Sequence, residues 1–471
     1  MRRVGVRRAP VEPLPQSHTI PTPIPAINLA PVYSFERGWS ARQRRFMIML
    51  ASSMALFALV FPFPTLAILF SLLWVVFSIL ILWRLTLIII GLAVRFRPKR
   101  PRYFPPSELP VYSLLIAVYD EAPVMAQLAG ALSQLVWPED KLDIQILLEA
   151  DDPDTLEAAL AAGFPRGTRM TIVPPGGVRT KANALNYGLA RARGSLTCIY
   201  DAEDRPHPGQ LMEAYRAFES YKGNVACAQA PLVGDNGEDS LIAAHWSLEY
   251  ATQFGLLVPA MAALRLPIPI GGTSNHFRTD VLRGLGGWDA FNVTEDADLG
   301  LRLSRFGRRV VMLNLPTYED APTAFGVWVA QRSRWIKGFV QTWAVLMRRP
   351  VWLWKQLGAV RFLSVQMALG GAVLAPIFHG PMLLFVVLAL VSEAFSVGAI
   401  GSVLLCSGLV VGALGDILAP GPWHAGRLAA VVTRAVYWPL HSLAAIKAIR
   451  ELVSAPHFWA KTPHQPHVRR G

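Results

Sequence analysis

Two long apolar blocks frame this chain, and apolar and polar segments alternate between them. The first block covers residues 46–94, where Arg84 is the single charged residue. Its length suits two membrane spans of about 20 residues each. The sequence Phe61-Pro62-Phe63-Pro64 interrupts this block. Because each proline removes a backbone donor, we predict a hairpin of two helices that turns there.

The second block extends from about residue 362 to residue 446 and contains three breaks. They are His379-Gly380-Pro381, Ser392-Glu393 and a stretch rich in glycine and proline at 415–426. This partition predicts about four transmembrane helices within residues 359–450, at 363–378, 382–397, 399–417 and 428–446. The first two are short for a bilayer, so three helices are the alternative. Six spans in the whole chain are the favoured count.

The segment 339–358, just before this second block, mixes tryptophan with basic side chains. Trp343, Trp352 and Trp354 lie among two arginines and a lysine. That combination is typical of an amphipathic segment at a membrane interface, with apolar bodies in the acyl boundary and charges at the headgroups. An ordinary helix packed on the protein is the alternative.

Residues 105–338 have a different pattern, in which short strand-like runs alternate with helical segments. The runs occupy residues 111–118, 144–148, 170–173 and 196–200. This alternation predicts an α/β domain whose parallel sheet is covered by helices. In such sheets ligands bind beyond the carboxyl ends of the strands. The residues that follow each run are therefore candidates for a functional site.

Composition indicates a membrane protein with a large soluble domain rather than an ordinary soluble enzyme. Hydrophobic residues make up 53% of the chain and charged residues 16%, against about 25% charged in a soluble domain. That apolar fraction also excludes a disordered chain. Three cysteines are too few and too scattered for a disulfide framework or a zinc site.

The formal net charge of +13 is concentrated beside the apolar blocks. Basic residues gather in a proline-rich arm at 1–45, just after residue 94, and in the tail at 451–471. The positive-inside rule explains these clusters and places the middle domain and the tail on the cytoplasmic side. Nucleic-acid binding is the less economical alternative.

Three of the predicted strands end in acidic residues. The sequences are Tyr119-Asp120-Glu121, Glu149-Ala150-Asp151-Asp152 and Asp201-Ala202-Glu203-Asp204. Asp201 and Glu203 are two positions apart, so both carboxylates can face one hard cation, and Mg²⁺ and Mn²⁺ prefer oxygen ligands of this kind. Solvated loops are the alternative, because an Asp-x-Glu pair alone is a weak signal.

Two more motifs lie downstream of the acidic turns. Thr294-Glu295-Asp296 precedes a helical stretch and, taken alone, is explained by helix capping. Gln331, Arg334 and Trp335 have the spacing i, i+3, i+4 and share one helix face. On that face a guanidinium can bind phosphate oxygens and an indole can support a sugar ring. A membrane-anchoring face is the alternative.

In this order, the YDE, DxE, TED and QxxRW motifs resemble those of family 2 glycosyltransferases with the GT-A fold. The pattern is most similar to that of membrane-embedded processive synthases such as the catalytic subunit of bacterial cellulose synthase. The resemblance covers roughly residues 110–340 and the flanking membrane arrangement. It implies a Rossmann-like GT-A domain at 105–338, inserted between N-terminal and C-terminal transmembrane helices.

The resemblance implies a nucleotide and metal site. Tyr119, Glu121, Asp151, Lys181 and Asp201 would bind the nucleotide. Asp201 would also hold Mg²⁺ or Mn²⁺, together with Glu203. Two positions stay open, because Asp204 competes with Glu203 as the second metal ligand and the second turn offers Glu149 and Asp152 beside Asp151.

The same resemblance implies the reacting and acceptor-binding residues. Asp296 would be the general base, acting with an ordinary aspartate pKa. Gln331, Arg334 and Trp335 would hold the diphosphate and the acceptor end. Ser274 and Asn275, within IPIGGTSNHFR, would lie under the acceptor sugar, although a plain glycine-rich turn is the alternative there.

The activity implied is a metal-dependent, inverting transfer of sugar from a nucleotide sugar, with UDP-glucose as the expected donor. The expected product is a β-linked exopolysaccharide, made by a multi-pass protein of a bacterial-type inner membrane and exported through its own spans. Expected partners are membrane lipid, a glycan or lipid acceptor and an accessory export subunit, with no nucleic acid. A non-processive glycolipid synthase and a non-catalytic membrane scaffold are the alternatives. The intact motif set argues against the scaffold.

Overall fold

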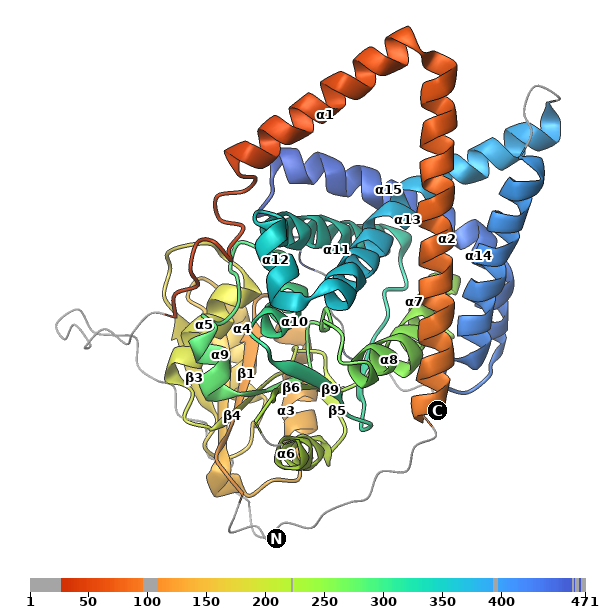
Figure 1. Ribbon diagram of the computed structural model, residues 1–471. Coiled ribbons are helices and arrows are strands. Elements are labelled where there is room, and N and C mark those ends of the chain that lie inside the picture. Colours follow the sequence, from red (N-terminus) through yellow and green to blue (C-terminus); the bar gives the residue numbers. More distant parts are fainter. Residues whose placement is uncertain are drawn as a thin grey trace.

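The computed structural model describes residues 27–95, 109–221, 223–392, 397–459, 461 and 466. Most of the basic arm, most of the second basic cluster and ten of the 21 residues of the basic tail lie outside the described residues. The described chain forms a domain of sheet and helices joined to a set of long helices (Figure 1).

The strands and helices follow one another in the order that the sequence pattern predicts for an α/β domain between helical regions. The strands are β1 (Tyr112–Val118), β2 (Leu142–Glu149), β3 (Arg169–Val173), β4 (Leu196–Ile199), β5 (Arg205–Pro206), β6 (Val225–Gln229), β7 (Leu232–Gly234), β8 (Asn275–Arg278), β9 (Arg309–Met312) and β10 (Thr317–Glu319). The helices of the middle domain are α3 (Met125–Ser133), α4 (Pro153–Ala161), α5 (Lys181–Arg191), α6 (Gln210–Ser220), α7 (Leu241–Thr252), α8 (Val258–Ala263), α9 (Thr279–Gly284), α10 (Glu295–Arg305) and α11 (Phe325–Leu346). The flanking helices are α1 (Ala41–Val60), α2 (Pro62–Arg95), α12 (Pro350–Leu357), α13 (Ala359–Val391), α14 (Gly398–Leu418) and α15 (Ala425–Ser454).

The main sheet has the strand order β3-β2-β1-β4-β8-β6-β9. Strands β3, β2, β1 and β4 run parallel, whereas β8 is antiparallel to both β4 and β6. The sheet is therefore mixed rather than wholly parallel, because the chain re-enters it through β8 from the opposite direction. A smaller sheet, β5-β10-β7, lies apart from it. The carboxyl ends of β1, β2 and β4 share one edge of the main sheet, where the three acidic turns follow.

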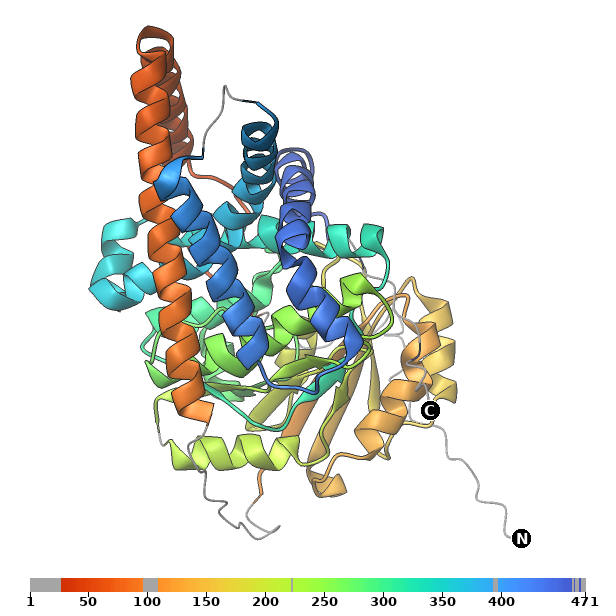
Figure 2. The ribbon, with the colours of Figure 1, turned by 90° about the vertical axis from the view of Figure 1, so that its right-hand side faces the viewer.

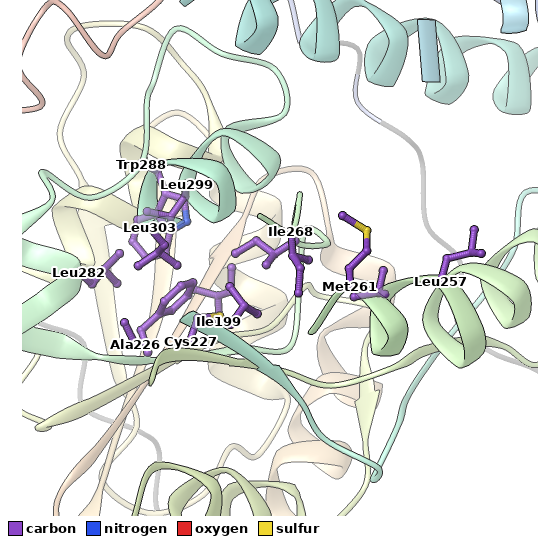
Figure 3. Packing of buried hydrophobic residues seen from close by; sticks show 14 of the residues in the cluster. Ile199, Ala226, Cys227, Leu257, Met261, Ile268, Leu282, Trp288, Leu299 and Leu303 are labelled. Carbon is purple, nitrogen blue, oxygen red and sulfur yellow. The ribbon is translucent and has the colours of Figure 1, made fainter. Parts of the chain in front are cut away.

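One hydrophobic cluster joins the sheet to the helices that cover one of its faces. In Figure 3, Ile199 and Cys227 of the sheet lie close to Leu303 of α10 and to Trp288 in the preceding loop. The same cluster includes Ile88 of α2, which is fully buried. The lower part of this long helix is thus packed into the core of the α/β domain.

The two N-terminal helices, α1 and α2, meet at Phe61, where the sequence predicts a turn. Figure 1 shows α1 and the upper part of α2 projecting away from the sheet as a hairpin. Within the described part of the chain, four helices are long and apolar enough to cross a membrane, namely α1, α2, α13 and α14. These helices indicate a membrane-associated protein.

The expected pair of spans at 363–378 and 382–397 is wrong, because α13 runs unbroken through Pro376 and Pro381. Ser442 of α15 supports the helix at this point. Its hydroxyl donates to the Pro376 carbonyl (2.5 Å) and accepts from the Gly380 backbone N–H (2.8 Å). The hydroxyl thus bridges a carbonyl and an N–H that are one helical turn apart between the two prolines, and side chains of neighbouring helices support proline-containing membrane helices in this way.

The expected fourth C-terminal span at 428–446 lies within α15, which contains several buried polar residues, including Arg434 and His441. It is not among the four helices that meet the length and composition of a span. The described residues therefore give four such helices and not six. The expected interfacial segment 339–358 forms the end of α11 and the short helix α12, on which Trp354 is exposed.

Candidate active site

A single cavity of about 980 Å³ begins at the acidic edge of the sheet and continues between α2, α13, α14 and α15. It brings together residues from many separate segments of the sequence. The predicted site residues that line it are Tyr119, Glu121, Lys181, Asp201, Glu203, Asp296, Gln331, Arg334 and Trp335. Asp151, Ser274 and Asn275 are not among the lining residues.

Asp151 is connected to the cavity by an ion pair with Arg179, a residue that the sequence analysis did not single out. Arg179 lines the cavity, donates to the Tyr119 hydroxyl at 3.0 Å, and forms an ion pair with Asp151. Both partners of the pair are about half exposed, at 55% and 52%. Solvent weakens such a pair, so both side chains can exchange partners when a ligand enters.

Among the acids of the second turn, Asp152 has a structural role. Its carboxylate caps α4 by accepting from the Thr155 N–H (3.1 Å) and also accepts from the Asp120 N–H (2.5 Å). Asp120 has a φ of 53°, a conformation rare outside glycine. Asp152 therefore fixes the turn after β1, whereas Glu149 lines the cavity.

The third acidic turn also divides its carboxylates between structure and cavity. Asp204 is completely buried and accepts from the Asp201 N–H at 2.7 Å and from the Thr273 hydroxyl. Asp201 and Glu203 line the cavity. Both bonds to Asp204 reach Oδ2, which holds the turn together, whereas Oδ1 of Asp204 is buried without a hydrogen-bond partner. Asp204 therefore stays open beside Glu203 as a metal ligand.

Lys181 contacts Asp201 directly, at the first turn of α5. Its ammonium forms an ion pair with the Asp201 carboxylate and donates to the Gly272 carbonyl at 2.7 Å. Burial alone would lower the pKa of Lys181, yet the carboxylates of Asp201 and Glu295 raise it above its ordinary value. The lysine therefore stays protonated and keeps a positive charge beside the acidic turn.

Glu319, at the end of β10, is a cavity residue that the sequence analysis missed. Its Oε1 atom is buried without a hydrogen-bond partner. Burial first, and then the carboxylates of Asp204, Glu203 and Asp201, raise the pKa of Glu319 well above its usual range. No local sequence signal marks it, because it ends a three-residue strand that is far along the chain from the acidic turns.

The carboxylates of Asp201, Glu203 and Glu319 suit a hard divalent cation in their chemistry. They supply oxygen ligands, as Mg²⁺ and Mn²⁺ require, and their mutual repulsion would be relieved by a cation. Among the described residues, however, no three acidic, histidine or cysteine side chains already stand in metal-binding geometry. A cation would need further ligands, such as substrate phosphates.

Asp296 lies in the first turn of α10, and its carboxylate accepts from the Ala297 N–H at 2.8 Å. The backbone of Gly272 lies close to this carboxylate: a Cβ added to Gly272 would lie 3.3 Å from Asp296 Oδ2. Burial raises the pKa of Asp296 above its ordinary value, although Lys181 and Arg334 oppose this. The expectation of an ordinary pKa therefore differs from the structure, whose buried setting makes the carboxylate a stronger base.

The expected helical face of Gln331, Arg334 and Trp335 exists on α11 and points into the cavity. Gln331 accepts a hydrogen bond from the Trp246 indole at 2.8 Å, and the Trp335 ring stacks with Tyr250 at 6.0 Å between centroids. These contacts fix the amide and make an aromatic surface. The sequence spacing predicted the face but not its aromatic partners on α7.

Helix α11 lies close against the turn that leads into Asp296. A Cβ added to Gly338 would lie 2.3 Å from Thr294 Oγ1, so glycine permits this approach. The Thr294 side chain makes no capping bond to α10. The capping explanation of the TED motif therefore does not account for this threonine.

The expectation that Ser274 and Asn275 lie under an acceptor sugar is wrong for their side chains. Both residues are completely buried at the start of β8. The Ser274 hydroxyl bonds to the Thr317 hydroxyl (2.6 Å), and the Asn275 amide donates to the Gly271 carbonyl (2.5 Å). Gly271 and Gly272, just before them, line the cavity instead.

The segment after α15 also reaches the cavity, which the sequence analysis did not foresee. Lys337 donates to the Phe458 carbonyl and Gln341 to the Pro456 carbonyl, both at 2.7 Å. Trp459 and Lys461 line the cavity, and the Lys461 ammonium lies 3.5 Å from the Glu121 carboxylate. A tryptophan within a basic tail is the signal that could have marked this segment.

Comparisons with known proteins agree with this arrangement. Residues 113–268 match the family described as Glycosyl transferase family 2, and residues 196–413 match Glycosyl transferase family group 2. A probable glucomannan 4-beta-mannosyltransferase 7 of Oryza sativa subsp. japonica is 27% identical over 240 residues, which are 49% of this chain and 41% of the relative. The probable glycosyltransferase YdaM of Bacillus subtilis (strain 168) is 25% identical over 239 residues, 49% of this chain and 56% of the relative. The chain thus spans about half the length of the curated relatives it matches.

A solved structure has the same fold. A mannosyltransferase from Pyrobaculum calidifontis, in complex with GDP-Man and Mn²⁺, aligns with a TM-score of 0.50 at 20% identity, covering 79% of this chain and 99% of that chain. At this identity the likeness establishes the GT-A fold alone. Together with the two family matches, it confirms the resemblance that the motifs indicate: the chain carries family 2 glycosyltransferase domains on a GT-A fold.

Proposed function

We propose that this protein transfers a sugar, with inversion, from a nucleotide sugar to an acceptor hydroxyl at the membrane. The observation that carries the proposal is the single cavity. It joins the partly buried carboxylate of Asp296 to the acidic turns on one side and to the long apolar helices on the other.

The proposed reaction is one in-line displacement. Asp296 accepts the proton of the acceptor hydroxyl, whose oxygen forms a bond to the anomeric carbon of the donor. The bond between that carbon and the diphosphate oxygen breaks, and its electron pair leaves with the nucleoside diphosphate. Proton transfer to a positioned base and alignment of the reactants each lower the barrier.

The leaving diphosphate would lie between Lys181 and Arg334, the two cations that act on Asp296. Arg334 has a buried Nε atom without a hydrogen-bond partner, which suits a phosphate oxygen. Asp201, Glu203 and Glu319 would hold Mg²⁺ or Mn²⁺ with those phosphates. When bound, the cation neutralises charge that develops on the leaving group.

Two donors merit a test. The motif resemblance favours UDP-glucose, whereas the names of the rice relative and of the Pyrobaculum neighbour concern mannosyl transfer. We therefore propose a nucleotide-activated hexose and test both nucleotide sugars. The catalytic domain would face the cytoplasm of a bacterial-type inner membrane, where such donors are made.

Two products merit a test as well. The motif pattern favours a β-linked exopolysaccharide that leaves through the spans, with an accessory subunit in export. One observation favours a glycolipid instead, because the part of the cavity between the spans has many aliphatic side chains, such as Leu80, Leu383 and Leu405. The aromatic rings of Phe77, Trp83 and Trp438 line the same part, and they suit the sugar rings of a glycan.

The test is transfer by purified full-length protein in nanodiscs with Mg²⁺ or Mn²⁺ and radiolabelled UDP-glucose or GDP-mannose. The wild type should label an acceptor, and Asp296→Asn should reduce turnover by roughly 10²- to 10⁴-fold while nucleotide binding persists. Retained turnover in this variant would sink the assignment of the base. Label in a polymer supports the synthase, and label in a single-sugar lipid supports the glycolipid enzyme.

A further inference from the structure

The membrane half of the cavity is apolar along the long helices and charged where it meets the α/β domain. Between α2, α13 and α14 the walls are largely aliphatic, with Leu80, Leu383, Val386, Leu404 and Leu405 among them. Toward the catalytic domain the same space is bounded by charged side chains from α2, α7, α11 and α15. An apolar chamber with a charged end suits an amphiphile, whose hydrocarbon part would contact the apolar walls and whose polar part would contact the charges.

Arg84 is one of the charged residues at this end of the membrane half. It is the single charged residue of the first apolar block, and it lines the cavity from within α2. Its Nε atom is buried without a hydrogen-bond partner, and no described carboxylate lies within ion-pair distance. Its guanidinium reaches toward α14, because a Cβ added to Gly415 would lie 3.8 Å from Nη2. A charge placed inside an apolar helix is costly and marks a functional site.

The acids nearest to Arg84 are already paired with other groups. Asp416 forms an ion pair with Arg434 and accepts from the Thr252 hydroxyl at 3.3 Å. Glu249 pairs with Arg332 and accepts from the Tyr437 hydroxyl at 3.3 Å.

Three arginines therefore meet two carboxylates in this region. Nη2 of Arg434 is also buried without a partner. The excess of positive charge, together with these unpaired nitrogens, suits an anion.

We propose that the acceptor is an anionic lipid, with its hydrocarbon chain between α2, α13 and α14 and its phosphate at Arg84. A free hydroxyl on the same headgroup would give its proton to Asp296 in the displacement described above, and the anomeric carbon would exchange its diphosphate oxygen for the lipid oxygen. This inference rests on the proposed function and names its acceptor. The aliphatic walls match a hydrocarbon chain, and the unpaired guanidinium matches a phosphate.

The experiment uses full-length protein in phosphatidylcholine nanodiscs that contain either dioleoyl phosphatidylglycerol or dioleoylglycerol at the same mole fraction. Labelled UDP-glucose or GDP-mannose is supplied with Mn²⁺, and label is counted in the organic phase. We expect phosphatidylglycerol to be labelled about tenfold or more above dioleoylglycerol, because a charge-assisted hydrogen bond to phosphate distinguishes them.

Variants locate the effect. Arg84→Gln should raise the KM for phosphatidylglycerol about tenfold and leave the donor KM unchanged, with partial recovery in Arg84→Lys. Arg450→Gln, on the exposed side of α15, is the matched control. If Arg84→Gln does not fold, Ala372→Phe fills the chamber from α13, and Val387→Phe, exposed on the same helix, is its control.

Several outcomes would overturn the inference. They are equal labelling of the two lipids, label in polymer alone, an Arg84→Gln protein with unchanged lipid KM, and phosphatidylglycerol that binds in native mass spectrometry but is never labelled. These results leave transfer itself intact and so are distinct from failure of the proposed function. Absence of label from every acceptor with both donors would overturn the proposed function, and the acceptor with it.

Discussion

The two ends of the cavity have opposite charge imbalances. At the sheet edge, the carboxylates of Asp201, Glu203 and Glu319 line the cavity, and Lys181 acts on Asp201 and Glu319. At the membrane end, arginines outnumber the acids that they meet. In the proposed function each end would be completed by a ligand of the opposite charge, a cation with its phosphates at one end and an anionic headgroup at the other.

The two ends also differ in how their charges are held. The acidic turns are fixed locally by backbone bonds, as when Asp204 accepts from the Asp201 N–H. No such bond from a described residue holds Arg84, which is positioned by the packing of α2. This packing is close at Gly91, where an added Cβ would lie 2.3 Å from the Leu256 carbonyl oxygen. Local hydrogen bonds build one end of the cavity, whereas helix packing builds the other.

Removing a carboxylate from the acidic end should have the largest effect. We expect Asp201→Asn to lower turnover about 10³-fold, because a cation at a leaving group contributes several kcal/mol and each 1.36 kcal/mol is tenfold in rate. Glu319→Gln should weaken apparent Mn²⁺ affinity in the same assay.

The exposed Asp154→Asn, on α4, is the matched control for both. Unchanged Mn²⁺ titrations in Asp201→Asn and Glu319→Gln would show that this end of the cavity does not hold a cation.

The pH dependence should separate Asp296 from an ordinary aspartate. The base acts in its ionised form, so kcat/KM should fall tenfold per unit as the pH drops below its pKa. Because burial raises the pKa of Asp296, this fall should begin at a higher pH than the ~3.9 of a free aspartate would give.

The neighbouring carboxylate offers a check on this assignment. Burial and then Asp296 raise the pKa of Glu295 to about 7, whereas the pKa of Asp296 is raised by burial alone and is opposed by the Ala297 N–H, Lys181 and Arg334. Glu295→Gln should therefore leave the acid limb of kcat/KM in place. A limb that moves to lower pH would show that repulsion from Glu295 also raises the pKa of Asp296.

Packing between α11 and the Asp296 turn should have a smaller effect. Gly338→Ala inserts a methyl group against Thr294, and overpacking of this kind costs about 1–3 kcal/mol. The melting temperature and turnover should both fall. Gly326→Ala, on the same helix and with open space around its Cβ, should leave both unchanged. Equal behaviour of the two variants would show that the close approach does not position Asp296.

The rim of the cavity should be the least sensitive part. Arg179→Gln removes a half-exposed ion pair with Asp151, which solvent already screens. We expect an unchanged melting temperature and a donor KM raised by a few-fold at most. A loss of turnover as large as that of Asp201→Asn would place Arg179 among the residues that act on the reacting diphosphate.

The sequence by itself determined the apolar blocks, the turn between α1 and α2 at Phe61, the acidic ends of β1, β2 and β4, and the shared face of Gln331, Arg334 and Trp335. These features depend on local periodicity and on spacing along one element, which sequence carries directly. The motif order was also enough to predict the GT-A fold and the glycosyltransferase class.

The tertiary structure alone decided which of these residues face the cavity. It buried Ser274 and Asn275, assigned Asp204 and Asp152 to the turns, and added Glu319 to the cavity. It also kept α13 continuous through its prolines, with Ser442 as the partner. Each of these outcomes depends on a group far away in the sequence that supplies a hydrogen bond or a charge, and no local pattern reports that partner.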